Sequence, residues 1–261
     1  MALQKSLEID VILAPNLLTE AEMGGSLCAV IDVLRATSTL TIAFANGIQK
    51  VFPFKNSGEA RAFATALPSG TYLLGGEERS VKIPGFDLGN SLLEYTDTVV
   101  KGKTLLFSTS NGTPTLQRAF AGSHAPVYLA SLLNISAVCA AMVKMTADGH
   151  FSSLTFVCSG RLGKPSSEDT FCAGVGVQKL SQLLVDVGVI PELTDCASIA
   201  AHFAWSNNDK ALAVLSNCEH GRSLFPLGFA KDVELAAEVD KYDITPVFDG
   251  KAIEIPQPKL F

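Results

Sequence analysis

The chain has 261 residues, of which 26 are acidic and 20 are basic, so its net charge is −6 with neutral histidines. Apolar residues make up 48% of the chain and charged residues only 18%, a balance that excludes an intrinsically disordered protein. The acidic character also excludes a general nucleic-acid binder, because such a protein needs a basic surface to displace counterions.

The sequence shows no feature of a membrane or exported protein. The longest unbroken apolar run, residues 137–143, is far shorter than the roughly 20 residues that span a bilayer. Lys5, Glu8 and Asp10 occupy positions where a signal peptide has its apolar core. The 6 cysteines lack CxxC spacing, which indicates neither a zinc site nor a redox pair. We therefore expect a cytoplasmic protein with reduced cysteines and no membrane partner.

Short apolar runs alternate with helical stretches along the chain. The apolar runs predict strands at residues 6–13, 27–33, 51–54, 71–74, 103–108, 127–130, 153–158, 246–248 and 252–255. The stretches between them predict helices at residues 37–45, 58–66, 114–121, 137–145, 170–187, 196–205, 209–215 and 231–239. Ser57 is the expected N-cap of the second of these helices, and residues 159–169 are the expected polar loop before the fifth.

This alternation predicts an α/β fold, in which helices cover both faces of a largely parallel or mixed sheet in three α/β/α layers. Two similar α/β halves also fit the repeated rhythm, with a weak boundary in the polar stretch near residues 146–152. We expect an N-terminal half at residues 1–150 and a C-terminal half at residues 151–261. The first would carry the loops of Asp32, Glu77 and Asn111, and the second the loop of Glu168 and Asp169.

Polar residues cluster after four of the predicted strands. Ligands of open α/β sheets bind beyond the carboxyl ends of the parallel strands, so these clusters are expected to meet. Their members are Asp32, Arg35 and Thr37; Glu77 and Arg79; Asn111, Gly112 and Thr113; and Arg161, Glu168 and Asp169. Carboxylate oxygens suit Mg²⁺, and the N–H groups of glycine-rich helix starts suit a phosphate.

Each piece also has a purely structural interpretation. Asp32 fits a buried, hydrogen-bonded acid that pairs with Arg35. Asn111 and Gly112 form a common turn dipeptide. Glu168 and Asp169 fit the first turn of a helix, where the helix dipole favours acids. Threonines near these turns fit local caps, and Lys82 fits a solvated loop residue.

Several familiar motifs are absent from the sequence. It contains no GxxxxGK[ST] phosphate loop, no GxGxxG after a strand, no DxDx[TV] run and no GxSxG elbow. The histidines show no metal-ligand spacing either. These absences argue against P-loop, nicotinamide-dependent, haloacid-dehalogenase and serine-hydrolase chemistry.

Six segments together resemble the 2-phosphosulfolactate phosphatase family. They are VIDVLRATST at 30–39, ANG at 45–47, KIPGFDLGNS at 82–91, SNGT at 110–113, SEDTFCAG at 167–174, and HGR at 220–222 with LG at 227–228. The segments follow the family's order across nearly the whole chain, and the KIPGFDLGNS run is long and specific. The resemblance implies an α/β phosphatase that depends on Mg²⁺ and releases phosphate from 2-phospho-3-sulfolactate, a step toward coenzyme M.

The chain departs from the family pattern at a few positions. Glu78 follows Glu77 where the family usually has arginine, and Arg79 comes one residue late. Arg161 stands where threonine is common. We therefore expect Arg161 to supply binding that the family's earlier arginine gives, because a guanidinium holds an anion through paired hydrogen bonds. These departures leave the substrate open and motivate an alternative, a non-catalytic binding protein for an anionic metabolite.

The expected activity is hydrolysis of a small phosphorylated 2-hydroxy acid, and a homodimer is an open expectation. The expected catalytic residues are Asp32, Arg35, Asn111, Thr113, Arg161 and Asp169. The expected substrate-binding residues are Lys82, Thr37, Gly112, Arg79 and His220. The expected Mg²⁺ ligands or ligand holders are Asp32, Glu77 and Glu168, with Asp169 as an alternative to the last.

Overall fold

The sheet is built around β2, which is buried at every position, as expected for a parallel strand covered on both faces. In the computed structural model, which describes residues 5–19 and 23–256, the strands form an 11-stranded mixed sheet. Their order across the sheet is β5 (Val81–Lys82), β4 (Tyr72–Glu78), β6 (Thr104–Ser108), β3 (Lys50–Phe54), β11 (Ile253–Glu254), β10 (Val247–Phe248), β7 (Val127–Ala130), β2 (Ser26–Ile31), β8 (Ser153–Cys158), β1 (Ser6–Ile12) and β9 (Ile190–Leu193).

Two parallel blocks make up this sheet. In the larger block, β7, β2, β8, β1 and β9 pair in parallel. In the smaller block, β4, β6 and β3 pair in parallel, and β5 adds an antiparallel edge. The antiparallel hairpin of β10 and β11 joins the blocks by pairing with β7 and β3. Because β10 and β11 have only two residues each, they join the blocks over a short length.

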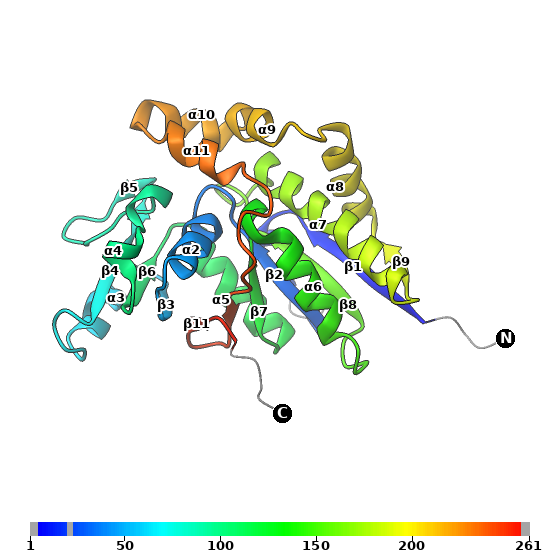
Figure 1. Ribbon diagram of the computed structural model, residues 1–261, viewed down its shortest axis with the longest axis horizontal. Helices are drawn as coiled ribbons and strands as arrows, with labels where there is room; N and C mark the ends of the chain where they lie inside the picture. The colour runs from blue at the N-terminus through cyan, green and yellow to red at the C-terminus, as the bar shows by residue number, and fades with distance from the viewer. Residues whose placement is uncertain (1–4, 20–22, 257–261) are drawn as a thin grey trace.

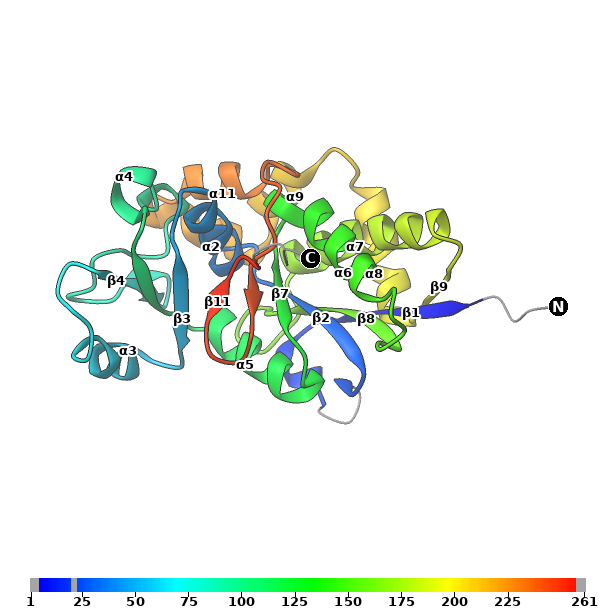
Figure 2. The same ribbon diagram turned by 60° about the horizontal axis from the view of Figure 1, so that its bottom comes forward.

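Helices cover both faces of the sheet and one of its ends. The described α-helices are α2 (Ala36–Ala45), α3 (Ser57–Ala64), α4 (Asp97–Val100), α5 (Gly112–Ser123), α6 (Ile135–Met145), α7 (Ser167–Asp186), α8 (Asp195–Ser206), α9 (Ala211–Asn217), α10 (Glu219–Leu224) and α11 (Ala230–Ala236). Figure 2 shows α2, α6 and α7 over one face and α3 and α5 over the other. In Figure 1, α9, α10 and α11 lie across the end of the sheet from which α2 begins. The carboxyl ends of β2 and β8 therefore face these three short helices.

The predicted α/β class and three-layer arrangement are confirmed, and the sheet is mixed rather than wholly parallel. The predicted bounds of β8, residues 153–158, match the structure, and β7 matches as well. The strand expected after residue 150 lies between β1 and β2 in the same sheet. One large apolar core spans both expected halves, so residue 150 marks no break in the sheet or in the core.

Several local predictions were wrong. The N-cap of α3 is Asn56 rather than Ser57, since the Asn56 side chain accepts a hydrogen bond from the N–H of Glu59. β4 runs on past residue 74 because Gly75 and Gly76 continue the pairing with β6. The helix expected from residue 170 begins at Ser167.

Two elements of the C-terminal half were not predicted from the sequence. β9 contains Pro191, a residue that a strand tolerates only at an edge, and β9 is the edge strand of its block. α10 has only six residues, too few to show helical periodicity. Among the described residues, no helix is both long and apolar enough to cross a membrane.

Candidate active site

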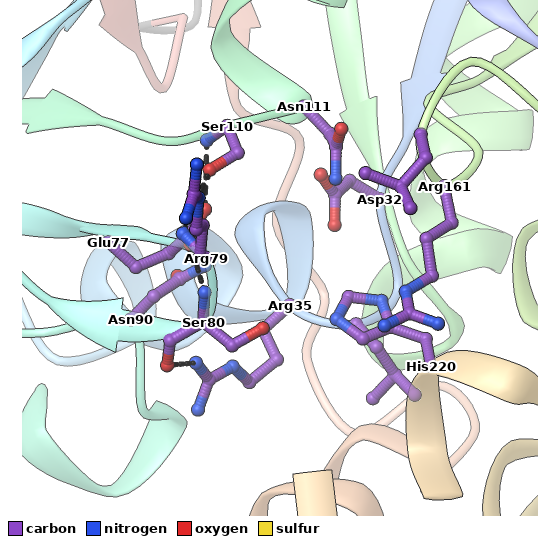
Figure 3. A pocket seen from close by; sticks show the side chains of 12 residues that line it. Asp32, Arg35, Glu77, Arg79, Ser80, Asn90, Ser110, Asn111, Arg161 and His220 are labelled. Carbon is purple, nitrogen blue, oxygen red and sulfur yellow. Dashed lines mark hydrogen bonds between the residues drawn. The ribbon is translucent and has the colours of Figure 1, made fainter. Parts of the chain in front are cut away.

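A cavity of about 190 Å³ lies at the carboxyl ends of the strands, where the two parallel blocks meet. Figure 3 shows Glu77, Ser80, Asn90 and Ser110 on one side of this central cavity and Asp32, Arg161 and His220 on the other. The side chains that line it are Asp32, Leu34, Arg35, Glu77, Arg79, Ser80, Asn90, Ser110, Asn111, Arg161, Leu162 and His220. The structure thus brings together seven of the residues singled out in the sequence: Asp32, Arg35, Glu77, Arg79, Asn111, Arg161 and His220.

Asp32 follows β2 and is only 6% exposed. Its Oδ1 accepts a hydrogen bond of 3.1 Å from the N–H of Ala36, while no hydrogen bond within the described residues engages Oδ2. Burial raises the pKa of Asp32 to about 6. The nearby charge of His220 opposes this rise, and the carboxylates of Glu77 and Glu168 add to it. A buried carboxyl with one free oxygen and a raised pKa is typical of a functional group.

Thr37 holds the turn that presents Asp32. Its hydroxyl donates to the carbonyl of Asp32 at 2.8 Å and accepts from the N–H of Asp32 at 3.0 Å. Thr37 does not line the central cavity, so the structure places it as a support for the turn rather than as a contact for substrate.

Gly112 allows α5 to approach Asp32 closely. A Cβ at this position would lie 2.8 Å from Oδ2 of Asp32 and 2.7 Å from the Cβ of Ala36, so no side chain fits without displacing the carboxylate. The next residue, Thr113, exchanges hydrogen bonds with Thr109 across the turn. Gly112 and Thr113 therefore shape the site and do not line the central cavity.

Glu77 connects the loops that follow β4 and β6. Its Oε1 accepts from the N–H of Ser110 at 2.8 Å, and its Oε2 accepts from the N–H of Ser80 at 2.5 Å. Arg79 and Ser80 between these contacts have φ values of 52° and 67°, in the left-handed region. Because of this turn, the exposed Arg79 lines the cavity. Glu78 does not line it, and its Oε1 accepts a hydrogen bond from the hydroxyl of Ser57.

Arg35 is a fixed, buried cation that is only 3% exposed. Its Nη1 lies 2.9 Å from Oδ2 of Asp232, and its Nη2 donates to the carbonyl of Ser80 at 3.0 Å. The guanidinium also stacks on Phe229, with 3.9 Å between Cζ and the ring centroid. The other oxygen of Asp232 accepts a hydrogen bond of 2.7 Å from the hydroxyl of Ser91. α11 therefore orients Arg35 toward the central cavity.

Arg161 and His220 form the wall nearest to α10. Nη1 of Arg161 lies 2.8 Å from Oε1 of Glu219, and its Nη2 donates to the hydroxyl of Ser223 at 3.3 Å. Nδ1 of His220 lies 3.6 Å from Oε1 of Glu168. Burial alone would raise the pKa of Glu168, but hydrogen bonding and the charge of His220 bring it below its ordinary value. Arg161 thus reaches the cavity with part of its charge already paired.

Asp169 is a buried carboxyl that connects two loops. Its Oδ1 accepts from the N–H of Val33 and its Oδ2 from the N–H of Gly160, both at 2.9 Å. Burial, followed by the neighbouring charges of Glu168 and Asp32, raises its pKa well above the ordinary value. Asp169 does not line the central cavity, so its contacts are those of a positioning group.

Lys82 and Glu168 also lie outside the lining of the central cavity. Lys82 is exposed on β5, where its Nζ donates to the carbonyl of Asp87 at 3.5 Å. Glu168 is buried and lines a neighbouring cavity. Within residues 5–19 and 23–256, no three His, Cys, Asp or Glu side chains converge to hold a metal ion. The expected Mg²⁺ ligands Asp32, Glu77 and Glu168 therefore do not converge on one point within the described residues.

Sequence reasoning missed two functional candidates. Asn90 is 5% exposed and lines the central cavity, and its Oδ1 has no hydrogen-bond partner within the described residues. It lies in the segment at 82–91 whose resemblance to the family was noted, and this was the signal available for it. Asp232, the partner of Arg35, lies 197 residues further along the chain, and no motif marked it.

The comparisons with known proteins cover nearly the whole chain. Residues 12–251 match the family model described as 2-phosphosulpholactate phosphatase. A protein of Symbiobacterium thermophilum named probable 2-phosphosulfolactate phosphatase is 37% identical over 239 residues, covering 91% of this chain and 98% of that protein. A protein of Carboxydothermus hydrogenoformans with the same name is 38% identical over 240 residues, covering 92% of each chain. The chain belongs to the 2-phosphosulfolactate phosphatase family.

Proposed function

We propose that the protein is a Mg²⁺-dependent phosphatase that hydrolyses 2-phosphosulfolactate or a related small phosphorylated 2-hydroxy acid. Membership of the family supports a phosphoric monoester hydrolase. The observation that carries the proposal is the position of Asp32, a buried carboxylate with one free oxygen in a cavity that Arg35 and Arg79 also line. We further propose a cytoplasmic location, a product on the route to coenzyme M, and a homodimer as the assembly to test.

The oxygen donors of the central cavity fit Mg²⁺. Asp32 offers its free Oδ2, Asn90 offers an unpartnered amide oxygen, and Glu77 offers the remaining lone pairs of its carboxylate. Mg²⁺ prefers oxygen ligands and is usually held by one or two carboxylates, with waters and substrate phosphate completing its shell. When bound, Mg²⁺ would neutralise charge on the phosphoryl oxygens.

Arg35 is the cation that we assign to the phosphoryl group. Phosphoryl transfer passes through a loose transition state with charge spread over the equatorial oxygens, so fixed cations contribute most of the catalysis. Asp232, the Ser80 carbonyl and Phe229 hold the guanidinium in place before a substrate arrives. Since a guanidinium has five N–H donors, donors remain for the phosphoryl oxygens.

Asn111 and the start of α5 are assigned to orient the phosphate. Asn111 is the N-cap residue of α5, yet its side chain makes no cap hydrogen bond and lines the central cavity. Gly112 supplies the N–H that is free for an anion at this helix start, because the N–H of Thr113 donates to the hydroxyl of Thr109 at 3.2 Å and Pro114 has no N–H. Asp32 lies beside this helix start, so close that a Cβ on residue 112 would meet its Oδ2, and only glycine fits there. We assign to Asp32 the orientation of the attacking water and the holding of the metal.

The binding-only alternative finds less support. It was motivated by the displacement of an arginine by one residue, but Arg79 still lines the central cavity because of the left-handed turn at Arg79 and Ser80. Arg161 lines the same cavity. The sequence led us to expect that Arg161 replaces the family's earlier arginine, whereas in this cavity Arg161 and Arg79 are both present.

Phosphate release tests the proposal directly. The purified protein is stripped of metal with EDTA and supplied with 2-phosphosulfolactate, 2-phospholactate or 2-phosphoglycerate, with and without Mg²⁺. We expect release from at least one of these substrates in Mg²⁺ and none in EDTA. Release that is equal in EDTA contradicts the metal dependence, and no release from any substrate favours the binding protein.

A further inference from the structure

Leu162 is an exposed apolar side chain in the lining of an otherwise polar cavity. Among the described residues that line the central cavity, the apolar ones are Leu34 and Leu162. Leu34 is only 2% exposed, whereas Leu162 is 80% exposed. Leu162 is therefore the residue that offers apolar surface to a molecule in this cavity.

The backbone at Leu162 has a conformation that disfavours leucine. Arg161 and Lys164 form an isolated antiparallel bridge, and reciprocal backbone hydrogen bonds of 2.9 Å between them close a tight turn over Leu162 and Gly163. The φ values of these two central residues are 51° and 74°, and positive values at both positions are those of a type I′ turn. Such a turn prefers Asn-Gly, because a left-handed backbone brings the Cβ of most other residues too close to the following carbonyl oxygen. The turn thus carries leucine where asparagine would be more stable.

Packing does not explain why leucine stands in this turn. The side chain belongs to neither apolar core among the described residues, in agreement with its high exposure. The cost of the left-handed backbone is therefore not offset by burial of the side chain. Backbone strain that is kept without a packing reason is typical of functional positions. For Leu162, the surrounding that a functional role can concern is the central cavity.

The proposed substrates have two chemically different parts. Their phosphate and carboxylate groups match the guanidinium groups of Arg35, Arg79 and Arg161, which line the central cavity. Their carbon chain favours an apolar neighbour, because contact with one removes apolar surface from water. Since Arg161 directly precedes Leu162 and both line the cavity, an anionic group on Arg161 brings the adjoining carbon atoms to the leucine side chain.

We propose that Leu162 packs against the carbon chain of the substrate and makes the site favour a methyl group over a hydroxymethyl group at the third carbon. The inference rests on the proposed phosphatase function and adds to it a specificity-determining residue. A hydroxyl group beside leucine loses hydrogen bonds with water, whereas a methyl group has none to lose. The strained turn holds the apolar side chain at the cavity at the expense of stability.

The test compares two substrates that differ only at the third carbon. 2-Phospholactate has a methyl group there and 2-phosphoglycerate has a hydroxymethyl group, while the phosphate and the carboxylate are the same. We expect Leu162→Asn to lower the ratio of kcat/KM for 2-phospholactate to kcat/KM for 2-phosphoglycerate roughly fivefold, through KM rather than kcat. An unchanged ratio would overturn the proposal, and so would an equal rise in KM for both substrates.

Thermal unfolding shows whether the exchange relieves the turn. Leu162→Asn should raise the Tm by roughly 2 to 4 °C, because asparagine suits the left-handed backbone and an exposed leucine has little packing to lose. A lower Tm would overturn the argument that leucine is unfavourable at this position.

Two further variants serve as controls for the apolar contact. Leu162→Met keeps an apolar side chain and should keep the substrate ratio, and loss of the preference in this variant would overturn the contact. His124→Asn introduces asparagine at another exposed residue with a positive φ of 53°. His124 follows the C-terminal end of α5, whereas Gly112 begins this helix beside Asp32, so His124→Asn should leave the ratio unchanged.

Calorimetry separates the role of Leu162 from the phosphatase function. If the wild-type protein releases no phosphate, calorimetry in Mg²⁺ measures the binding of the same two compounds. We expect Leu162→Asn to weaken the binding of 2-phospholactate relative to that of 2-phosphoglycerate by the same factor of roughly five. That result without phosphate release would contradict the phosphatase function alone. An equal change for both compounds, or binding of neither by the wild-type protein, would overturn the role of Leu162.

Discussion

Replacing Asp32 by asparagine should stabilise the metal-free protein while abolishing its activity. Asparagine keeps the shape of the side chain and an oxygen that can accept the hydrogen bond from Ala36. It removes an ionised carboxylate that is only 6% exposed. A pKa raised from 3.8 to about 6 corresponds to roughly 3 kcal/mol of unfavourable free energy for the ionised folded form.

The sign of the pH dependence follows from this shift. The folded-state pKa of Asp32 lies above its unfolded value, so its contribution to stability is complete below about pH 4 and is lost as the pH rises through about 6. The stability of Asp32→Asn relative to wild type should therefore grow from about pH 4 to about pH 6 and stay constant above. For a chain of this size, roughly 3 kcal/mol corresponds to a Tm higher by roughly 6 to 12 °C.

Urea denaturation followed by circular dichroism in EDTA, from pH 4.5 to 8, measures this difference. Asp148→Asn is the matched control, because Asp148 is exposed in the polar loop before β8 and its replacement should change stability at no pH. An Asp32→Asn protein that is no more stable than wild type at pH 8, or whose gain does not vary with pH, would refute the reasoning. Turnover near the wild-type rate would separately show that Asp32 is only structural.

Three further predictions concern the surroundings of the site. Asp232→Asn leaves the buried Arg35 without a charged partner, so the free energy of unfolding should fall by roughly 3–5 kcal/mol. The kcat of this variant should fall roughly 10- to 100-fold, because Arg35 is no longer held in place. A normal kcat would show that catalysis does not need Asp232 to orient Arg35. Gly112→Ala should lower the affinity for Mg²⁺ in calorimetry, because its Cβ meets Oδ2 of Asp32, whereas Gly24→Ala has open space and should not. Arg161→Lys should raise KM more than it lowers kcat, and unchanged KM for every active substrate would show that Arg161 binds none of them.

The alternation of apolar runs was sufficient to predict the α/β class and most of the strands. β2 was recognisable because every one of its residues is buried, and such strands have continuous apolar sequences. β9 and α10 were not predicted, because an edge strand with a proline and a six-residue helix show almost no periodic pattern of apolar residues. Helix starts were less certain, as the true cap at Asn56 and the start of α7 at Ser167 show.

The candidate site was predictable where a residue follows a strand directly. Asp32 and Asn111 come after strands of the sheet, Glu77 lies near the end of β4, and all three line the central cavity. Distinguishing a lining residue from a supporting one required coordinates, since Asp169 belongs to the polar cluster expected after β8 but its two oxygens both accept from backbone N–H groups. Asp232 was beyond sequence reasoning because only the packing of α11 brings it to Arg35.

The central claim is that Asp32 holds a divalent cation in the cavity between the two parallel blocks. The most direct measurement is an anomalous difference map from crystals of the wild-type protein soaked in Mn²⁺, a substitute for Mg²⁺ that scatters anomalously. We expect a peak within coordination distance of Oδ2 of Asp32 that is lost in crystals of Asp32→Asn. A peak elsewhere in the molecule, or an unchanged peak in Asp32→Asn, would contradict it.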